Sequence, residues 1–90
     1  MTESIMQKEK ECYITGSSVH LDRHHCMPGT ANRKKSEKYG LWVWLRHDIH
    51  ASLHDKNKEL ERRLKEDAQR AFEAKYGHDM WMKTFGKNYL

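Results

Sequence analysis

The chain has 90 residues, of which 37% are hydrophobic and 33% are charged, so it predicts a single small domain over residues 1–90 with a thin core. Two cysteines cannot form a disulfide framework, and the sequence contains no apolar run long enough to span a bilayer. The net charge of +4 favours a polyanionic partner. The charged N-terminus has no signal-peptide pattern, so we expect a cytoplasmic protein without a membrane partner.

The N-terminal third of the chain predicts one strand. Residues 1–10 are polar, and we expect them to be frayed or loosely helical. A turn is indicated at Gly16, and residues 19–25 alternate weakly in polarity, which is typical of a strand. Because side chains alternate along a strand, the consecutive His24 and His25 would point to opposite faces.

The stretch from Cys26 to Gly40 contains Pro28 and Gly29 and has little apolar content, so it predicts a loop. Residues 32–46 hold five basic residues and one acidic residue, and this stretch therefore accounts for the whole net charge. Basic side chains here can contact phosphates in a sequence-independent way. The predicted nucleic-acid contacts are Arg33, Lys34, Lys35, Lys38 and Arg46.

The rest of the chain predicts a strand and three helices. Residues 41–45 are aromatic and β-branched, which indicates a central strand, and residues 48–54 follow as a short helix. Asn57 is expected to cap a long helix that ends at Gly77, and Asp79 to cap a final short one. The expected buried stripe of the long helix is Leu60, Leu64, Ala68, Ala71 and Phe72.

The histidines are concentrated in one part of the chain: six of the seven fall between residues 20 and 54. His50 and His54 are four residues apart in the expected helix, which places both rings on one face. A third imidazole from His24 would complete a three-ligand metal site with an open position, the pattern of a catalytic centre. His25 is not needed as a ligand and would act as a general base on water. The sequence therefore predicts a small metal-dependent nuclease.

The order of these features resembles the ββα-metal finger of HNH endonucleases, the His-Me finger superfamily. A strand ends in His24 and His25, a loop and a second strand follow, and a helix carries His50 and His54. The likeness is greatest to colicin-type DNases and to small phage-encoded HNH proteins. It covers about residues 12–55 and implies an α+β fold, a small ββα-metal finger with additional C-terminal helices over about 57–90.

The resemblance also implies a function, the metal-dependent hydrolysis of DNA phosphodiester bonds by a one-metal mechanism. His24, His50 and His54 match the metal ligands. His25 matches the general base, and we expect a backbone carbonyl of the loop to hold its other ring nitrogen. Asp22 matches an acidic residue that helps to orient the site. The cofactor would be one divalent ion (Zn, Ni, Mn or Mg), with Zn-type ions preferred by imidazole ligands. The partner would be DNA, in the host cytoplasm if the protein is phage-encoded.

The sequence departs from the family at two places. The middle asparagine of the HNH pattern should fall near residues 40–41, where neither side chain can replace it. Many phage relatives carry two Cys-x-x-Cys knuckles that bind a structural zinc. Here the first remains only as Cys12 with Thr15, and the second would fall at Arg46 and Ile49, so no such zinc is expected.

Two other functions remain open at this point. The missing asparagine and the small size suggest a non-catalytic HNH-like protein that binds nucleic acid or protein, as a regulator or inhibitor. Alternatively, Cys26 would join the three histidines as the fourth ligand of a closed structural zinc site.

Overall fold

The fold consists of a two-stranded sheet and four helices within residues 2–27, 29–55 and 57–90, the parts of the chain that the computed structural model describes (of His54 and Asp55, the backbone only). The sheet is antiparallel and pairs β1 (Leu21–His25) with β2 (Trp42–Arg46). The helices are α1 (Thr30–Tyr39), α2 (His47–Asp55), α3 (Lys58–Tyr76) and α4 (His78–Phe85). The predicted α+β class is confirmed. None of the helices in these parts is both long and apolar enough to cross a membrane.

Both strands were predicted, but β1 is shorter than expected. It begins at Leu21 because His20 has a φ of 53°, in the left-handed region, which interrupts the extended backbone. Val19 is 58% exposed and does not share a buried face with Leu21. The amide of His47 donates a hydrogen bond to the carbonyl oxygen of His20 (2.7 Å), so the end of β2 leads into α2 beside the start of β1.

The segment predicted as a loop contains helix α1, so the loop prediction was wrong. Between Gly29 and Gly40 there is no glycine or proline, and most residues are good helix formers. Gly40 has a φ of 73° and caps the helix in the left-handed conformation, where glycine carries no steric penalty. In α1 the buried residue is Ser36 and the residue that packs against the core is Tyr39, so the helix needs little apolar content.

The N-terminal segment lies along β2 and contains no helix within residues 2–20, contrary to the expectation that its first ten residues would be frayed or loosely helical. The hydroxyl of Ser4 donates to the carbonyl oxygen of Trp42 (2.5 Å). The amide of Trp44 donates to Oε1 of Gln7 (2.7 Å), and its carbonyl accepts from the amide of Tyr13 (2.8 Å). These hydrogen bonds satisfy backbone groups along the second edge of β2.

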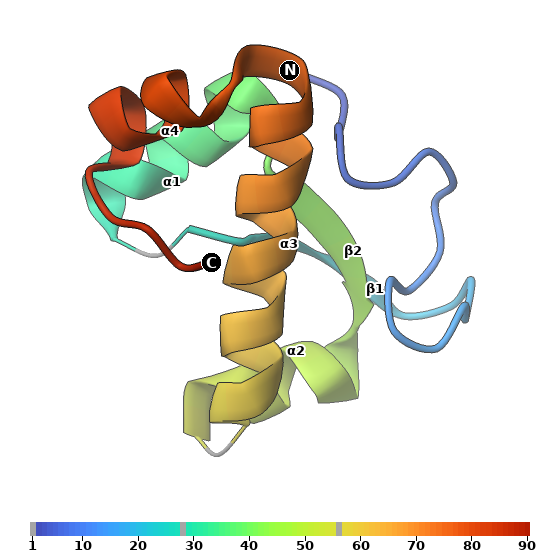
Figure 1. Cartoon of the computed structure of the whole chain (residues 1–90). Coiled ribbons are helices and arrows are strands. Elements are labelled where there is room, and N and C mark those ends of the chain that lie inside the picture. Colours follow the sequence, from blue (N-terminus) through green and yellow to red (C-terminus); the bar gives the residue numbers. More distant parts are fainter. Residues whose placement is uncertain (1, 28, 56) are drawn as a thin grey trace.

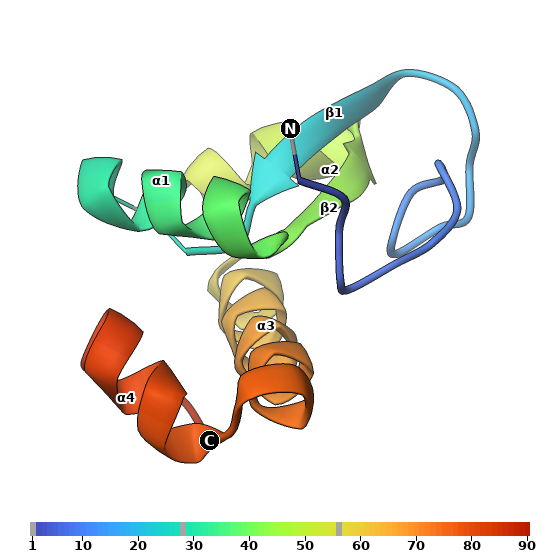
Figure 2. The ribbon, with the colours of Figure 1, turned by 90° about the horizontal axis from the view of Figure 1, so that it is seen from above.

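Helices α3 and α4 pack on one side of the sheet. Figure 1 shows α3 crossing the strands, and Figure 2 shows α3 and α4 together below them. Oδ1 of Asn57 accepts from the amide of Leu60 (3.1 Å), which confirms the predicted cap. Gly77 ends α3 as predicted. Because α4 begins directly after Gly77, Asp79 lies in its first turn and does not cap it, so that prediction was wrong.

The hydrophobic core lies between the sheet and these two helices. Leu64, Ala68 and Phe72 of the predicted stripe are fully buried, while Leu60 and Ala71 are partly buried. The described core residues are Cys12, Cys26, Met27, Leu41, Val43, Leu45, Leu64, Ala68, Phe72 and Trp81.

Candidate active site

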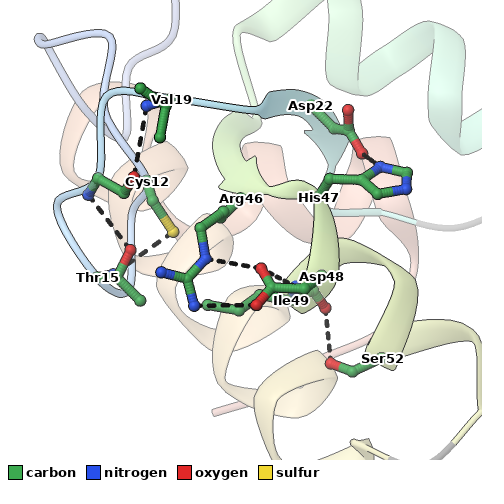
Figure 3. A network of polar contacts seen from close by, with 10 residues as sticks. Cys12, Thr15, Val19, Asp22, Arg46, His47, Asp48, Ile49 and Ser52 are labelled. Atoms are coloured by element: carbon green, nitrogen blue, oxygen red, sulfur yellow. Dashed lines mark hydrogen bonds and ion pairs between the residues drawn. The ribbon is translucent and has the colours of Figure 1, made fainter.

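Strand β1 and helix α2 bring His24 and His50 together. The centroids of their rings are 5.3 Å apart, in an edge-to-face arrangement. Asp22 lies on the same face of β1 as His24 because the two are separated by one residue. Its Oδ2 lies 3.0 Å from Nδ1 of His50 and 2.7 Å from Nδ1 of His47 (Figure 3 shows the second contact). The hydrogen bond from His50, followed by that from His47, holds the pKa of Asp22 below its ordinary value.

These contacts decide which nitrogen of His50 can bind another group. A carboxylate can only accept hydrogen bonds, so Nδ1 of His50 carries a hydrogen, and in the neutral ring Nε2 is the nitrogen with the lone pair. A carboxylate behind a histidine is the usual second partner of a metal-binding imidazole. An imidazole nitrogen lies about 2 Å from a bound zinc ion, so two ligand nitrogens lie within about 4 Å of each other. Ring centroids 5.3 Å apart are compatible with that separation.

The third predicted ligand, His54, falls on helix α2 one turn after His50, but its side chain lies outside the described residues. Among the side chains that the structure does describe, no group of three or more His, Cys, Asp and Glu residues is arranged to hold a metal ion. The described part of the candidate centre is therefore the pair of His24 and His50, with Asp22 behind it.

His25 and Arg23 lie on the other face of β1, and both contact Glu37 of α1. Nε2 of His25 lies 2.7 Å from Oε2 of Glu37, and Nη1 of Arg23 lies 3.4 Å from Oε1. The hydrogen bond with His25 holds the pKa of Glu37 below its ordinary value. The expected partner of His25 was a backbone carbonyl of a loop. That prediction was wrong because the segment is helical and supplies a carboxylate instead.

A single pocket of about 530 Å³ joins the two groups of histidines. His24, His25 and His50 all line it, with Arg33 of α1 among the other wall residues. A second pocket of about 450 Å³ shares part of this lining and adds Glu37. The predicted base and two of the predicted ligands therefore face the same space, although they come from both faces of β1 and from α2.

One face of α1 forms a wall of both pockets. Thr30, Arg33, Lys34 and Glu37 are separated by the i, i+3, i+4 and i+7 spacing of a helix face, and all four line the second pocket. Sequence reasoning selected Arg33 and Lys34 but missed Glu37. The helical spacing of these polar residues was the signal that could have identified it, and the loop prediction concealed that signal.

The other predicted nucleic-acid contacts lie elsewhere. Nζ of Lys35 donates to the carbonyl oxygen of Thr84 (2.6 Å) and so connects α1 with α4. Lys38 lies near the end of α1, with its ammonium group over the ring of the next residue, a tyrosine. Arg46 forms two hydrogen bonds with Asp48 (2.7 and 2.9 Å; Figure 3), at the start of α2. Of the five predicted contacts, only Arg33 and Lys34 line the candidate site.

Both cysteines are buried in the hydrophobic core. Burial raises the pKa of Cys12, but hydrogen bonds from Thr15 (Figure 3) and from the backbone of Arg46 outweigh it, so the pKa lies below its ordinary value. Burial raises the pKa of the Cys26 thiol, which lies 3.6 Å from the sulfur of Met6. Because zinc binds thiolates, this environment disfavours Cys26 as the fourth ligand of a structural zinc site.

No family model, curated protein sequence or solved structure matches the chain. The geometry of the pocket and its histidines therefore carries the functional argument.

Proposed function

We propose that the chain is a metal-dependent endonuclease of the HNH type, with β1, β2 and α2 as its ββα-metal finger. The observation that carries this proposal is the single pocket lined by His24, His25, His50 and Arg33. It combines potential metal ligands, a potential base and a cation. Phosphodiester hydrolysis requires these three functions within reach of one phosphate.

The proposed metal site consists of His24, His50 and His54. Its fit is supported by the chemistry of the described donors, since Asp22 accepts the hydrogen of Nδ1 of His50, an arrangement typical of a metal-binding imidazole. Neutral imidazoles favour Zn, Ni or Mn over Mg. When bound here, a divalent ion would neutralise charge on the phosphate and on the departing 3′ oxygen.

The chain's own residues would carry out the remaining steps. Neutral His25 takes a proton from water as the water oxygen forms a bond to phosphorus and the bond from phosphorus to the 3′ oxygen breaks. The 3′ oxygen then takes a proton from solvent. Arg33 and Lys34 contact flanking phosphates from α1, which makes the affinity for DNA salt-dependent and largely independent of sequence.

Replacing Asp22 with asparagine should weaken metal binding by roughly 10- to 100-fold, because the amide can donate to Nδ1 of His50 and so stabilise the wrong tautomer. Calorimetric titration of the purified protein with Zn²⁺ or Ni²⁺ measures this affinity. Asp48→Asn is the matched control, since Asp48 pairs with Arg46 rather than with a histidine. An unchanged affinity in the Asp22 variant would remove Asp22 from the proposed site.

The proposed function is tested by incubating supercoiled plasmid with the wild-type protein in EDTA and in Mg, Mn, Ni or Zn, with the bound metal measured in parallel. Nicking or linearisation that requires a metal is the expected result. His24→Ala should lose both metal and cleavage. His78→Ala should keep both, because His78 lies on α4 and contacts Glu73.

A protein that binds metal stoichiometrically but cleaves no plasmid under any condition would contradict the nuclease proposal. That result would favour the non-catalytic alternative, an HNH-like regulator or inhibitor that binds nucleic acid or protein. Gel-shift and pull-down experiments with the same preparation would then separate these two kinds of partner.

A further inference from the structure

Glu37 of helix α1 contacts the proposed base, although the sequence analysis assigned it no role. Among the described residues that line the two pockets, it is the single carboxylate. Its two oxygens contact two residues of the same strand face, His25 at 2.7 Å and Arg23 at 3.4 Å. The side chain of His25 is 17% exposed and that of Glu37 is 36% exposed, so the histidine is the more buried partner of this hydrogen bond.

The hydrogen bond determines the tautomer of His25. A neutral imidazole has one N–H donor and one acceptor nitrogen, whereas an ionised carboxylate can only accept. The hydrogen bond with His25 also keeps the pKa of Glu37 below its ordinary value, so this carboxyl group is ionised at neutral pH. Nε2 of His25 therefore carries the hydrogen, and Nδ1 is the nitrogen that can take up a proton.

We infer that Glu37 is a positioning residue, which fixes the orientation and tautomer of His25 so that Nδ1 accepts the proton of the attacking water. This inference rests on the proposed nuclease function. It replaces the expected backbone carbonyl with a carboxylate, and it gives helix α1 a part in the reaction. In His–carboxylate pairs of this kind the carboxylate holds the ring and stabilises the imidazolium that forms, without taking the proton itself.

The surroundings hold both ends of the pair in place. The guanidinium group of Arg23 lies 3.7 Å from the ring centroid of Trp42, which fixes the cation that contacts Glu37. Helix α1 is held at Gly40 by the left-handed cap, and Lys35 connects it with α4. Glu37 can therefore keep a constant position relative to β1, which a side chain on a mobile loop could not do.

The test compares Glu37→Gln with Glu61→Gln. Both variants remove one negative charge, and Glu61 lies on α3, where it pairs with Lys65 (3.0 Å). Plasmid cleavage is measured under single-turnover conditions, metal content is measured in parallel, and ¹⁵N NMR identifies which ring nitrogen of His25 carries the hydrogen at mildly alkaline pH. We expect wild type and Glu61→Gln to have the hydrogen on Nε2. Glu37→Gln should shift it toward Nδ1 and lower the cleavage rate by at least about 10²-fold, with the metal retained.

The NMR measurement keeps this inference separate from the nuclease proposal. If wild type cleaves no DNA, the proposed function fails, while the tautomer of His25 still tests the role of Glu37. A hydrogen on Nδ1 in wild type, or the same tautomer in Glu37→Gln as in wild type, overturns the inference. Cleavage by Glu37→Gln within twofold of wild type also overturns it.

Discussion

Replacing His25 with alanine should lower the rate of plasmid cleavage by about 10²- to 10⁴-fold, the usual contribution of a general base. His25 lines the pocket with His24 and His50 but contacts Glu37 rather than the proposed metal site. The metal content of the variant should therefore remain that of wild type. Loss of the proton acceptor and loss of the metal are distinct defects, and this variant should show only the first.

The measurement is single-turnover cleavage of supercoiled plasmid, with metal content determined on the same preparation. His78→Ala serves as the control because it also removes one imidazole, on the exposed part of α4. Cleavage by the His25 variant at the wild-type rate would remove His25 as the base. Loss of metal in the same variant would instead indicate that His25 supports the metal ligands.

The parts of the fold that the sequence predicted are those with a local signal. Three of these signals were placed correctly: the apolar run around Trp42 and Trp44, the Asn57 cap and Gly77. Each of them determines the backbone conformation of residues next to it in the chain. Helix α1 was missed because half of its residues are charged and only a narrow face contacts the core. A helix of this kind has no apolar periodicity, and tertiary packing stabilises it instead.

The difference between local sequence signals and tertiary contacts also applies to the residues of the site. His50 and His54 were chosen from a spacing of four residues, and His24 with His25 from their place at the end of a strand. Of the two carboxylates behind them, Asp22 was predicted through the family resemblance, whereas Glu37 was missed. Glu37 is 12 residues from His25, and Asp22 is 28 residues from His50, so the contacts exist only after α1 and α2 pack beside β1. The sequence therefore indicated the histidines and Asp22, and the tertiary structure added Glu37 and showed which histidine each carboxylate contacts.

Replacing Trp81 with alanine should cost about 3–5 kcal/mol of unfolding free energy, the range for truncating a large buried aromatic side chain. Trp81 is fully buried in α4, and its ring centroid lies 4.3 Å from that of Phe85 and 5.4 Å from that of Phe72. Its indole N–H donates a hydrogen bond to the carbonyl oxygen of Lys87 (2.8 Å). The variant should unfold more than about 12 °C below wild type in a thermal scan by circular dichroism. Met80→Ala is the matched control, because Met80 is 37% exposed on the same helix.

The lower stability of Trp81→Ala should also disturb the proposed active site, although Trp81 lines neither of its pockets. A small domain has only about 5–15 kcal/mol of stability, so the cavity removes a large share of it. Helix α4 holds α1 through the contact of Lys35 with Thr84, and α1 carries Glu37 and Arg33. Cleavage by Trp81→Ala should therefore fall at temperatures where wild type and Met80→Ala remain active, and Trp81→Phe should restore most of it. A variant that unfolds early yet cleaves at the wild-type rate while folded would show that the C-terminal helices stabilise the domain without positioning the catalytic side chains.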